Sequence, residues 1–200
     1  MPQPNCNFEL EYRKQGYQCV AGVDEVGVGC LAGPVVAGAV IFDLKRIPDG
    51  IDDSKRLTAK QRESLTVTIQ KVAVACSVGI ADVEEIDRLN IYHAARLAMV
   101  RAVNSLSMPP DFLLIDGRGK MDCPVSQLCI VKGDQISVSI AAASILAKVY
   151  RDNLMRNLDT EYPGYEFAKH KGYGSRLHRI LLQEKGPSPM HRKSFSWTPV

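Results

Sequence analysis

The chain has 200 residues, of which 46% are hydrophobic and 24% are charged, with 25 Lys and Arg side chains against 22 Asp and Glu. This length supports one substantial hydrophobic core, and the composition excludes a disordered, collagen-like or coiled-coil protein. No apolar run approaches the roughly 18–20 residues that a membrane helix needs, and the polar N-terminus does not resemble a secretion signal, so we expect a cytoplasmic protein.

Apolar and β-branched runs predict five short strands. They are Cys19–Val23, Val35–Phe42, Val72–Ile80, Phe112–Ile115 and Leu128–Val131. A capping box, in which Thr58 pairs with Gln61, predicts that a helix begins before the third strand. Helical spacing of apolar residues predicts another helix over Ile86–Val103, and an alanine-rich helix follows over Ser139–Asn157. This alternation predicts an α/β fold with a central mixed sheet flanked by helices.

Charge is distributed unevenly along the chain. Residues 168–200 hold seven basic side chains and one acidic side chain, a net charge of +6, whereas the remainder carries −3. Three of the four histidines lie in the same segment, as does a predicted short helix over Ser175–Lys185. We therefore distinguish a main domain, residues 1–167, from a basic helical extension, residues 168–200, packed on it as a single structural unit. A basic end on an acidic body indicates a polyanionic partner, although a solvated helix face would show the same pattern.

The six cysteines form no recognisable pattern. They contain no C-x-x-C pair and no matching histidine spacing, which argues against a zinc site. Cys19, Cys30 and Cys76 lie in apolar runs, where a thiol usually acts as a small hydrophobic group. A core of this size needs no disulfides, so we expect reduced thiols.

Acidic residues follow three of the predicted strands. Asp24 and Glu25 come after the first strand, Asp116 after the fourth and Asp134 after the fifth. Residues just beyond strand ends in an open α/β sheet converge on a shared crevice. Converging carboxylates repel one another unless a cation lies between them, and Mg²⁺ or Mn²⁺ suits their oxygens. Two such ions about 4 Å apart commonly cleave phosphodiesters, whereas the alternative is that these acids are ordinary turn residues.

A glycine pattern near the first acids admits a different interpretation. Gly27-x-Gly29-x-x-Ala32 follows a strand and nearly matches the dinucleotide-binding fingerprint, with Asp43 as a ribose ligand. That fingerprint requires a helix after the turn, but a Gly-Pro pair and a predicted strand follow here. The two adjacent carboxylates would also repel a pyrophosphate. An NAD-dependent oxidoreductase is therefore the weaker hypothesis.

Several motifs, taken in order, resemble those of bacterial ribonuclease HII. The segment Asp24–Val35 reads DEVGVGCLAGPV and is similar to the family's DEAGRGPLAGPV. The likeness continues through Asp53–Leu57, Leu89–Ile91, Ile115–Gly117, Lys132–Asp134, Ala142–Val149, Arg151-Asp152, His170–Gly174 and His191–Phe195. It extends from about Cys19 to Phe195. The resemblance implies a ribonuclease H-like fold, with residues 1–167 as its catalytic domain.

This resemblance implies an endonuclease that hydrolyses the RNA strand of RNA–DNA hybrids. It further implies cutting on the 5′ side of a single ribonucleotide in duplex DNA, leaving 3′-hydroxyl and 5′-phosphate ends, as in ribonucleotide excision repair. The implied cofactor is Mn²⁺ or Mg²⁺, with two ions during catalysis, and we expect a monomer. The family's catalytic and metal-binding carboxylates fall on Asp24, Glu25, Asp116 and Asp134. Asp152 is left outside this set, as half of a surface pair with Arg151.

The resemblance also implies contacts with the substrate. The family's Gly-Arg-Gly segment senses the 2′-hydroxyl through its backbone, and its arginine approaches a phosphate. Here that segment is Gly27-Val28-Gly29, without the guanidinium. Tyr173 matches a tyrosine that stacks on the next deoxyribose, although a Tyr capping a turn is the alternative. The expected backbone contacts of the duplex are Lys55, Arg176, Arg179 and Arg192. The alternatives are that Lys55 is an ordinary surface lysine and that His191-Arg192, which lies among turn residues, is structural.

The valine at position 28 motivates a second hypothesis. Loss of a charge-assisted contact with a phosphate costs about 1.5–3 kcal/mol. The chain could therefore be a nucleic-acid-binding module of the same fold, with weak or altered junction specificity. Turnover in the presence of Mg²⁺ or Mn²⁺, against a chelated control, separates this hypothesis from the nuclease.

Overall fold

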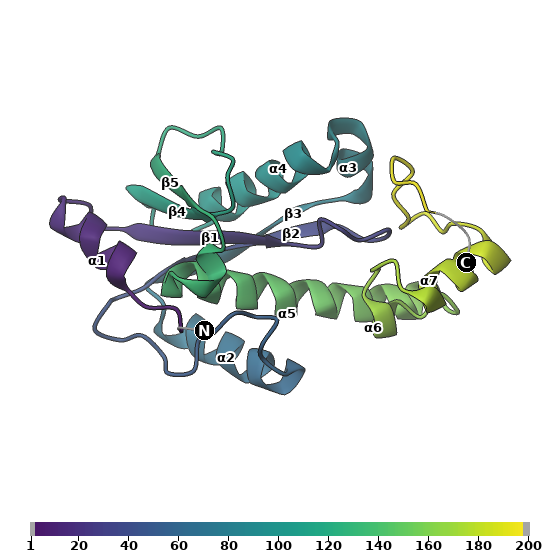
Figure 1. Ribbon diagram of the computed structural model, residues 1–200, viewed down its shortest axis with the longest axis horizontal. Helices are drawn as coiled ribbons and strands as arrows, with labels where there is room; N and C mark the ends of the chain where they lie inside the picture. Colours follow the sequence, from purple (N-terminus) through teal and green to yellow (C-terminus); the bar gives the residue numbers. More distant parts are fainter. Residues whose placement is uncertain (1–2, 198–200) are drawn as a thin grey trace.

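A five-stranded mixed sheet forms the centre of the computed structural model, which describes residues 3–197 (Figure 1). The strands are β1 Val20–Val26, β2 Val35–Ile41, β3 Ala75–Ala81, β4 Phe112–Asp116 and β5 Ser126–Ile130. Their order across the sheet is β3-β2-β1-β4-β5. β1, β2 and β3 pair antiparallel, whereas β1, β4 and β5 pair parallel. This topology confirms the predicted α/β fold with a mixed sheet.

Helices cover both faces of the sheet. The helical elements of residues 3–197 are α1 Asn7–Lys14, α2 Ala59–Val72, α3 Val83–Leu89, α4 Ile91–Asn104, the 3₁₀ turn η1 Gly133–Gln135, α5 Val138–Glu161, α6 Phe167–His170 and α7 Arg176–Lys185. In Figure 1, α3 and α4 lie above the sheet, and α5 and α2 lie below it. A separate hydrophobic cluster fills each interface, with α4 on one side and α5 on the other. Within residues 3–197, no helix is long and apolar enough to cross a bilayer.

Helix α5 lies unusually close to the two central strands. A Cβ on Gly22 would lie 2.1 Å from the backbone carbon of Ser139, and one on Gly38 would lie 2.3 Å from the carbonyl oxygen of Ala143. Only glycine leaves room for a helix backbone at this distance. The two glycines therefore bring α5 against β1, the strand that carries Asp24.

Several element boundaries differ from the sequence prediction, including the end of α5 and both ends of β5, and three differences change how the elements are interpreted. Strand β1 continues to Val26, so Asp24 and Glu25 lie inside the strand rather than beyond it, because β2 pairs with β1 through Val26. Helix α2 extends through Val72, so the third strand begins only at Ala75. The helix predicted over Ile86–Val103 is two helices. Asn90, at φ 67°, breaks it and caps α4 with its side chain.

Helix α1 was not expected from the sequence. It is a polar helix whose Glu9 side chain is 1% exposed. Glu9 accepts hydrogen bonds from Ser137 Oγ and from the Ser139 N–H, which belong to the first turn of α5. A carboxylate there is favoured by the unpaired N–H groups and the dipole of the helix. The contact fixes where α5 begins relative to the sheet.

The basic extension packs against the main domain. Its helix α7 agrees with the predicted Ser175–Lys185, with Ser175 as the N-cap and Gly186 as the C-cap. Buried Ala32 and Met155 of the main domain share a hydrophobic cluster with Phe167, at the proposed domain boundary, and with Met190 of the extension. Because the two parts share this cluster, the boundary at residue 167 stays a proposal, which separates them by function.

Candidate active site

The acidic residues predicted to converge lie around the ends of β1, β4 and β5. Asp24 and Glu25 belong to β1, Asp116 is the last residue of β4, and Asp134 lies in η1 just after β5. A cavity of about 240 Å³ is lined by Asp24, Glu25, Val26, Ser54, Lys55, Arg62, Asp116, Ser144, Lys148 and Tyr173. Asp134 borders it through Lys55, whose Nζ lies 3.0 Å from Asp134 Oδ2. We call Asp24, Glu25, Asp116 and Asp134 the carboxylate site.

The carboxylate site is electrostatically crowded. Burial, followed by the charges of Glu25 and Asp116, raises the pKa of Asp24 well above its usual value. Burial also raises the pKa of Glu25, although Arg96 opposes the shift. For Asp116, burial and the neighbouring Asp134 raise the pKa. It is unfavourable for all of these carboxyl groups to be ionised at once unless a positive charge lies among them.

The residues of this site fit a hard divalent cation. Glu25 Oε2 is buried without a hydrogen-bond partner, so one carboxylate oxygen is left available as a ligand. Asp24 accepts from the Glu25 N–H, and Asp116 accepts from the Gly133 N–H, which orients both groups. Within residues 3–197, no three acidic, His or Cys side chains are gathered closely enough to enclose an ion as they stand.

Positive side chains that were not singled out from the sequence line the other side of the cavity. Lys148 of α5 bonds Asp152 at 2.7 Å, and Arg62 of α2 lies 4.0 Å from the same carboxylate. Asp152 is therefore 8% exposed between two cations rather than part of a surface pair, and Arg151 is fully buried. The predicted Asp152–Arg151 surface pair is wrong, because neighbouring residues on a helix point in different directions. Ser144 and Lys148 are four residues apart, which places both on one side of a helix. This spacing could have indicated the side of α5 that lines the cavity.

Two buried arginines hold the loop between β1 and β2. Arg151 donates to the carbonyl groups of Ala32 and Pro34. Arg192 is 2% exposed and donates to the carbonyl groups of Gly27, Val28 and Gly33, at 2.7–3.0 Å. The side chain of Arg192 therefore supports the loop from within the protein. We correct the expectation that it contacts the duplex backbone, because its donors already have partners and it is buried.

The loop itself retains the features expected of the Gly-x-Gly segment. Gly27 has φ 96°, and a Cβ there would lie 2.3 Å from Arg151 Nε, so the position requires glycine. Val28 and Gly29 are exposed, and no hydrogen bond within residues 3–197 uses their N–H groups. After the loop comes β2 rather than a helix. The dinucleotide-binding hypothesis therefore lacks the helix N-terminus that a pyrophosphate would need.

Tyr173 lies between the loop and the carboxylate site. It is 41% exposed, and its backbone forms an antiparallel bridge with Cys30. The cations of Lys148 and Arg151 lie 5.6 and 5.8 Å from its ring centroid. An exposed aromatic ring beside the carboxylates offers a flat surface to a sugar or base. All six cysteines, Cys30 included, are free thiols.

The chain is similar in sequence and in fold to known proteins. A model of the family described as ribonuclease HII matches residues 21–198. The chain is 52% identical to ribonuclease HII of Geobacter sulfurreducens over 195 residues, which covers 97% of this chain and 90% of the relative. The crystal structure of ribonuclease H2 from Pyrococcus horikoshii OT3 superposes with a TM-score of 0.75 at 27% identity, covering 89% of this chain and 94% of that one.

A second solved structure extends the similarity of fold. The crystal structure of Bst-RNase HIII in complex with Mn²⁺ superposes with a TM-score of 0.62 at 22% identity, covering 88% of this chain and 66% of that one. The family match spans most of the chain and includes all four acids of the carboxylate site. The chain therefore belongs to the ribonuclease HII family, a metal-dependent group, and is an endoribonuclease.

Proposed function

We propose that the carboxylate site holds two divalent cations, Mg²⁺ or Mn²⁺, and cuts the RNA strand of RNA–DNA hybrids. The proposal includes cutting 5′ of a single ribonucleotide in duplex DNA, with 3′-hydroxyl and 5′-phosphate products. The observation that carries it is the crowding of four carboxylates beside a cavity, with Glu25 Oε2 buried and unpaired. The Mn²⁺ in the Bst-RNase HIII complex supports the choice of ion class.

The metal ligands would be Asp24, Glu25, Asp116 and Asp134. When bound, the ions supply an activated water on one side of the phosphodiester and stabilise the leaving oxygen on the other. The chain's own part is to hold the oxygens in place: Gly133 N–H fixes Asp116, and Glu25 N–H fixes Asp24. Lys55 has a 79% exposed side chain beside Asp134, so it can turn from the carboxylate to a substrate phosphate.

The loop Gly27–Gly29 and Tyr173 would recognise the ribonucleotide. Free N–H groups on Val28 and Gly29 are suitable donors to a phosphate or a 2′-hydroxyl. The ring of Tyr173 would lie against the neighbouring sugar, where the absence of a 2′-hydroxyl distinguishes DNA from RNA. Arg176 is exposed on α7 and would follow the duplex backbone. Because one chain supplies every residue named, we propose that a monomer is sufficient.

Cleavage of a duplex that holds one ribonucleotide tests the proposal. Asp116→Asn keeps the size of the side chain but removes a charged ligand, so we expect turnover with Mg²⁺ or Mn²⁺ to fall by at least about 1000-fold. Asp122→Asn is the matched control, because Asp122 is exposed in the loop between β4 and β5 and does not line the cavity. Mapping the cut position and the end groups tests the product assignment. Full activity of the Asp116→Asn enzyme, or a cut on the 3′ side, would refute it.

A further inference from the structure

Three histidines of the basic extension are buried side by side, and nothing in the proposed chemistry uses them. His170, His178 and His191 are 8%, 0% and 5% exposed. The rings of His170 and His178 stack with centroids 4.0 Å apart, and His178 Nε2 lies 2.9 Å from His191 Nε2. Phe167 packs against all three rings. We call these three residues the histidine cluster.

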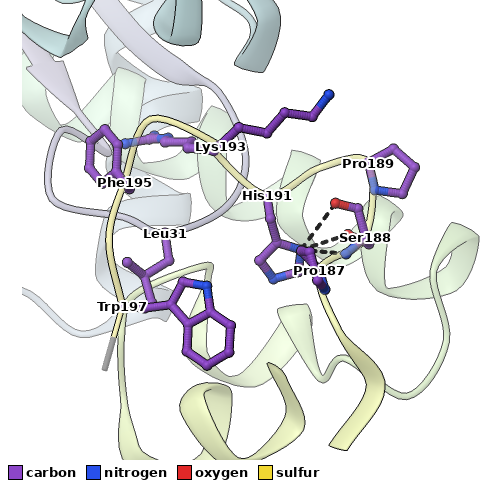
Figure 2. Close-up of a pocket in the computed structure, with 9 residues that line it drawn as sticks. Leu31, Pro187, Ser188, Pro189, His191, Lys193, Phe195 and Trp197 are labelled. Carbon is purple, nitrogen blue, oxygen red and sulfur yellow. Dashed lines mark hydrogen bonds between the residues drawn. The ribbon is translucent and has the colours of Figure 1, made fainter. Parts of the chain in front are cut away.

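The hydrogen-bond partners leave one protonation pattern for the cluster. The Ser188 N–H donates to His191 Nδ1 at 2.8 Å (Figure 2), so the His191 proton is on Nε2. That Nε2 faces His178. His178 must then accept at Nε2 and carry its own proton on Nδ1. That Nδ1–H donates to the Tyr173 carbonyl oxygen at 3.0 Å. Each nitrogen thus has one role, and a directional chain runs from Ser188 to Tyr173.

His170 completes the support of the same segment. Its Nδ1 accepts from the Gly172 N–H at 3.1 Å, and its Nε2–H donates to the Tyr165 carbonyl oxygen at 2.7 Å. Gly172 in turn accepts, through its carbonyl oxygen, from the Leu31 N–H of the loop after β1. The backbone on both sides of Tyr173 is therefore tied to imidazole rings.

The other end of the chain reaches the Gly27–Gly29 loop. His191 pairs with Ala32 in an isolated antiparallel bridge, and the next residue is Arg192, whose guanidinium donates to Gly27 and Val28. His191 also lines a cavity of about 540 Å³ between Leu31 and the tail, shown in Figure 2. The ring of His191 thus lies between the segment that carries Tyr173 and the residue that supports the loop.

We propose that His178 and His191 are positioning residues, which hold Tyr173 and, through Arg192, the Gly27–Gly29 loop in one fixed arrangement for recognising the ribonucleotide. The inference rests on the proposed function, because it assigns to these histidines the geometry of the two segments proposed to read the substrate. We expect the hydrogen-bond donor at Nδ1 of His178 to affect the selectivity for the ribonucleotide, and His178 to take no part in acid–base chemistry.

A pair of substitutions separates the two nitrogens of His178. The amide of Asn reaches about the position of Nδ1, so His178→Asn retains a donor for the Tyr173 carbonyl, whereas His178→Gln places its amide near Nε2 and loses that donor. The readout is kcat and KM on a duplex with one ribonucleotide and on a uniform RNA–DNA hybrid. We expect His178→Gln to lower the preference for the single ribonucleotide about fivefold, mainly through KM, and His178→Asn to stay within about twofold of the parent chain.

Exposed His93 supplies the matched control, because His93→Gln should leave the preference unchanged. Equal preferences in His178→Gln and the parent chain would overturn the inference, as would an equal loss in both His178 variants. If the parent chain cleaves neither substrate, the proposed function fails instead, so the two failures are distinguishable.

A measurement on the unaltered chain keeps the inference testable if the variants do not fold. Nitrogen-15 NMR distinguishes the two neutral forms of imidazole. We expect the proton on Nδ1 of His178 and on Nε2 of His170 and His191 at neutral pH. The opposite form at His178 would leave Tyr173 without its donor and would overturn the inference.

Discussion

The carboxylate site and the histidine cluster are both groups of buried titratable side chains, but they are built in opposite ways. In the carboxylate site, burial and the neighbouring acids raise the pKa of Asp24 and of Asp116, and Glu25 Oε2 has no hydrogen-bond partner. In the histidine cluster, every ring nitrogen has a partner from the chain itself. An unsatisfied buried group is costly and attracts a ligand, whereas a satisfied network makes the local structure rigid. The first region is thus suited to binding and the second to positioning.

The strongest test of this contrast is Asp24→Asn. We expect it to lower cleavage by at least about 1000-fold, because the most crowded carboxylate can no longer bind a cation as an anion. In EDTA we expect the same change to raise the melting temperature by about 2–4 °C per kcal/mol of repulsion removed. Calorimetry of the metal-free protein checks this second effect. A lower melting temperature would mean that charge repulsion at Asp24 does not destabilise the folded protein.

Arg192 follows His191 of the histidine cluster and supports the loop after β1. We expect Arg192→Met to destabilise the protein. It leaves the carbonyl groups of Gly27, Val28 and Gly33 without their donor, at a cost of about 3 kcal/mol. Arg176→Met is the control, because Arg176 is exposed on α7. Denaturation by urea measures both. Similar midpoints for the two variants would show that the loop does not depend on Arg192.

The two regions should respond to acid in opposite directions. Burial lowers the pKa of both His178 and His191 to about 4, below the ordinary value of 6.5. The stability that they contribute is therefore complete above pH 6.5 and is lost as the pH falls from 6.5 to 4. The expected loss is about 1 kcal/mol per pH unit for each of the two histidines.

In the carboxylate site, the raised pKa of Asp24 has the opposite sign, because protonation relieves repulsion as the pH falls. In the histidine cluster, His170 also faces three charged side chains, those of Asp159, Glu166 and Lys171. Melting curves in EDTA between pH 7.5 and 4.5 should thus fall more steeply for Asp24→Asn than for the parent chain. Parallel curves would contradict the assigned signs.

The smallest expected effect is at Val28, which lies on the loop between the two regions. Val28→Arg would add a charge-assisted contact with a phosphate and lower KM for the single-ribonucleotide duplex about tenfold. Val67→Arg is the control, because Val67 is exposed on α2. The gain should shrink as salt increases. An unchanged KM would indicate that the loop backbone reads the substrate without a guanidinium.

The sequence alone predicted the acids better than the bases. Asp116 and Asp134 could be identified because an apolar strand precedes each of them, and strand ends in an α/β sheet meet. Arg192 could not be placed, since a basic residue in a polar tail reads as exposed until the fold shows the carbonyl groups that surround it. Asp152 was misread because it follows Arg151 directly, and adjacent residues on a helix point in different directions.

Helix α1 escaped prediction because its docking depends on one buried carboxylate, Glu9, rather than on an apolar stripe. The break at Asn90 was missed because α3 and α4 continue the same apolar spacing on either side of it. In both cases a single polar side chain decides the structure. Periodicity of hydrophobic residues carries no information about such contacts.

Helix α5 also constrains how the length of this chain can vary. One stripe along it is formed by Ser144, Lys148, Arg151 and Met155. The first two line the cavity, Arg151 holds the loop after β1, and Met155 packs in the hydrophobic cluster that contains Phe167. One inserted residue turns everything beyond it by about 100°. An insertion early in α5 would therefore remove all three contacts together, whereas the loop at 117–125, between β4 and β5, has no such stripe to disturb. Insertions and deletions should be rejected in α5, and tolerated in that loop only where Met121 keeps its place in the hydrophobic core.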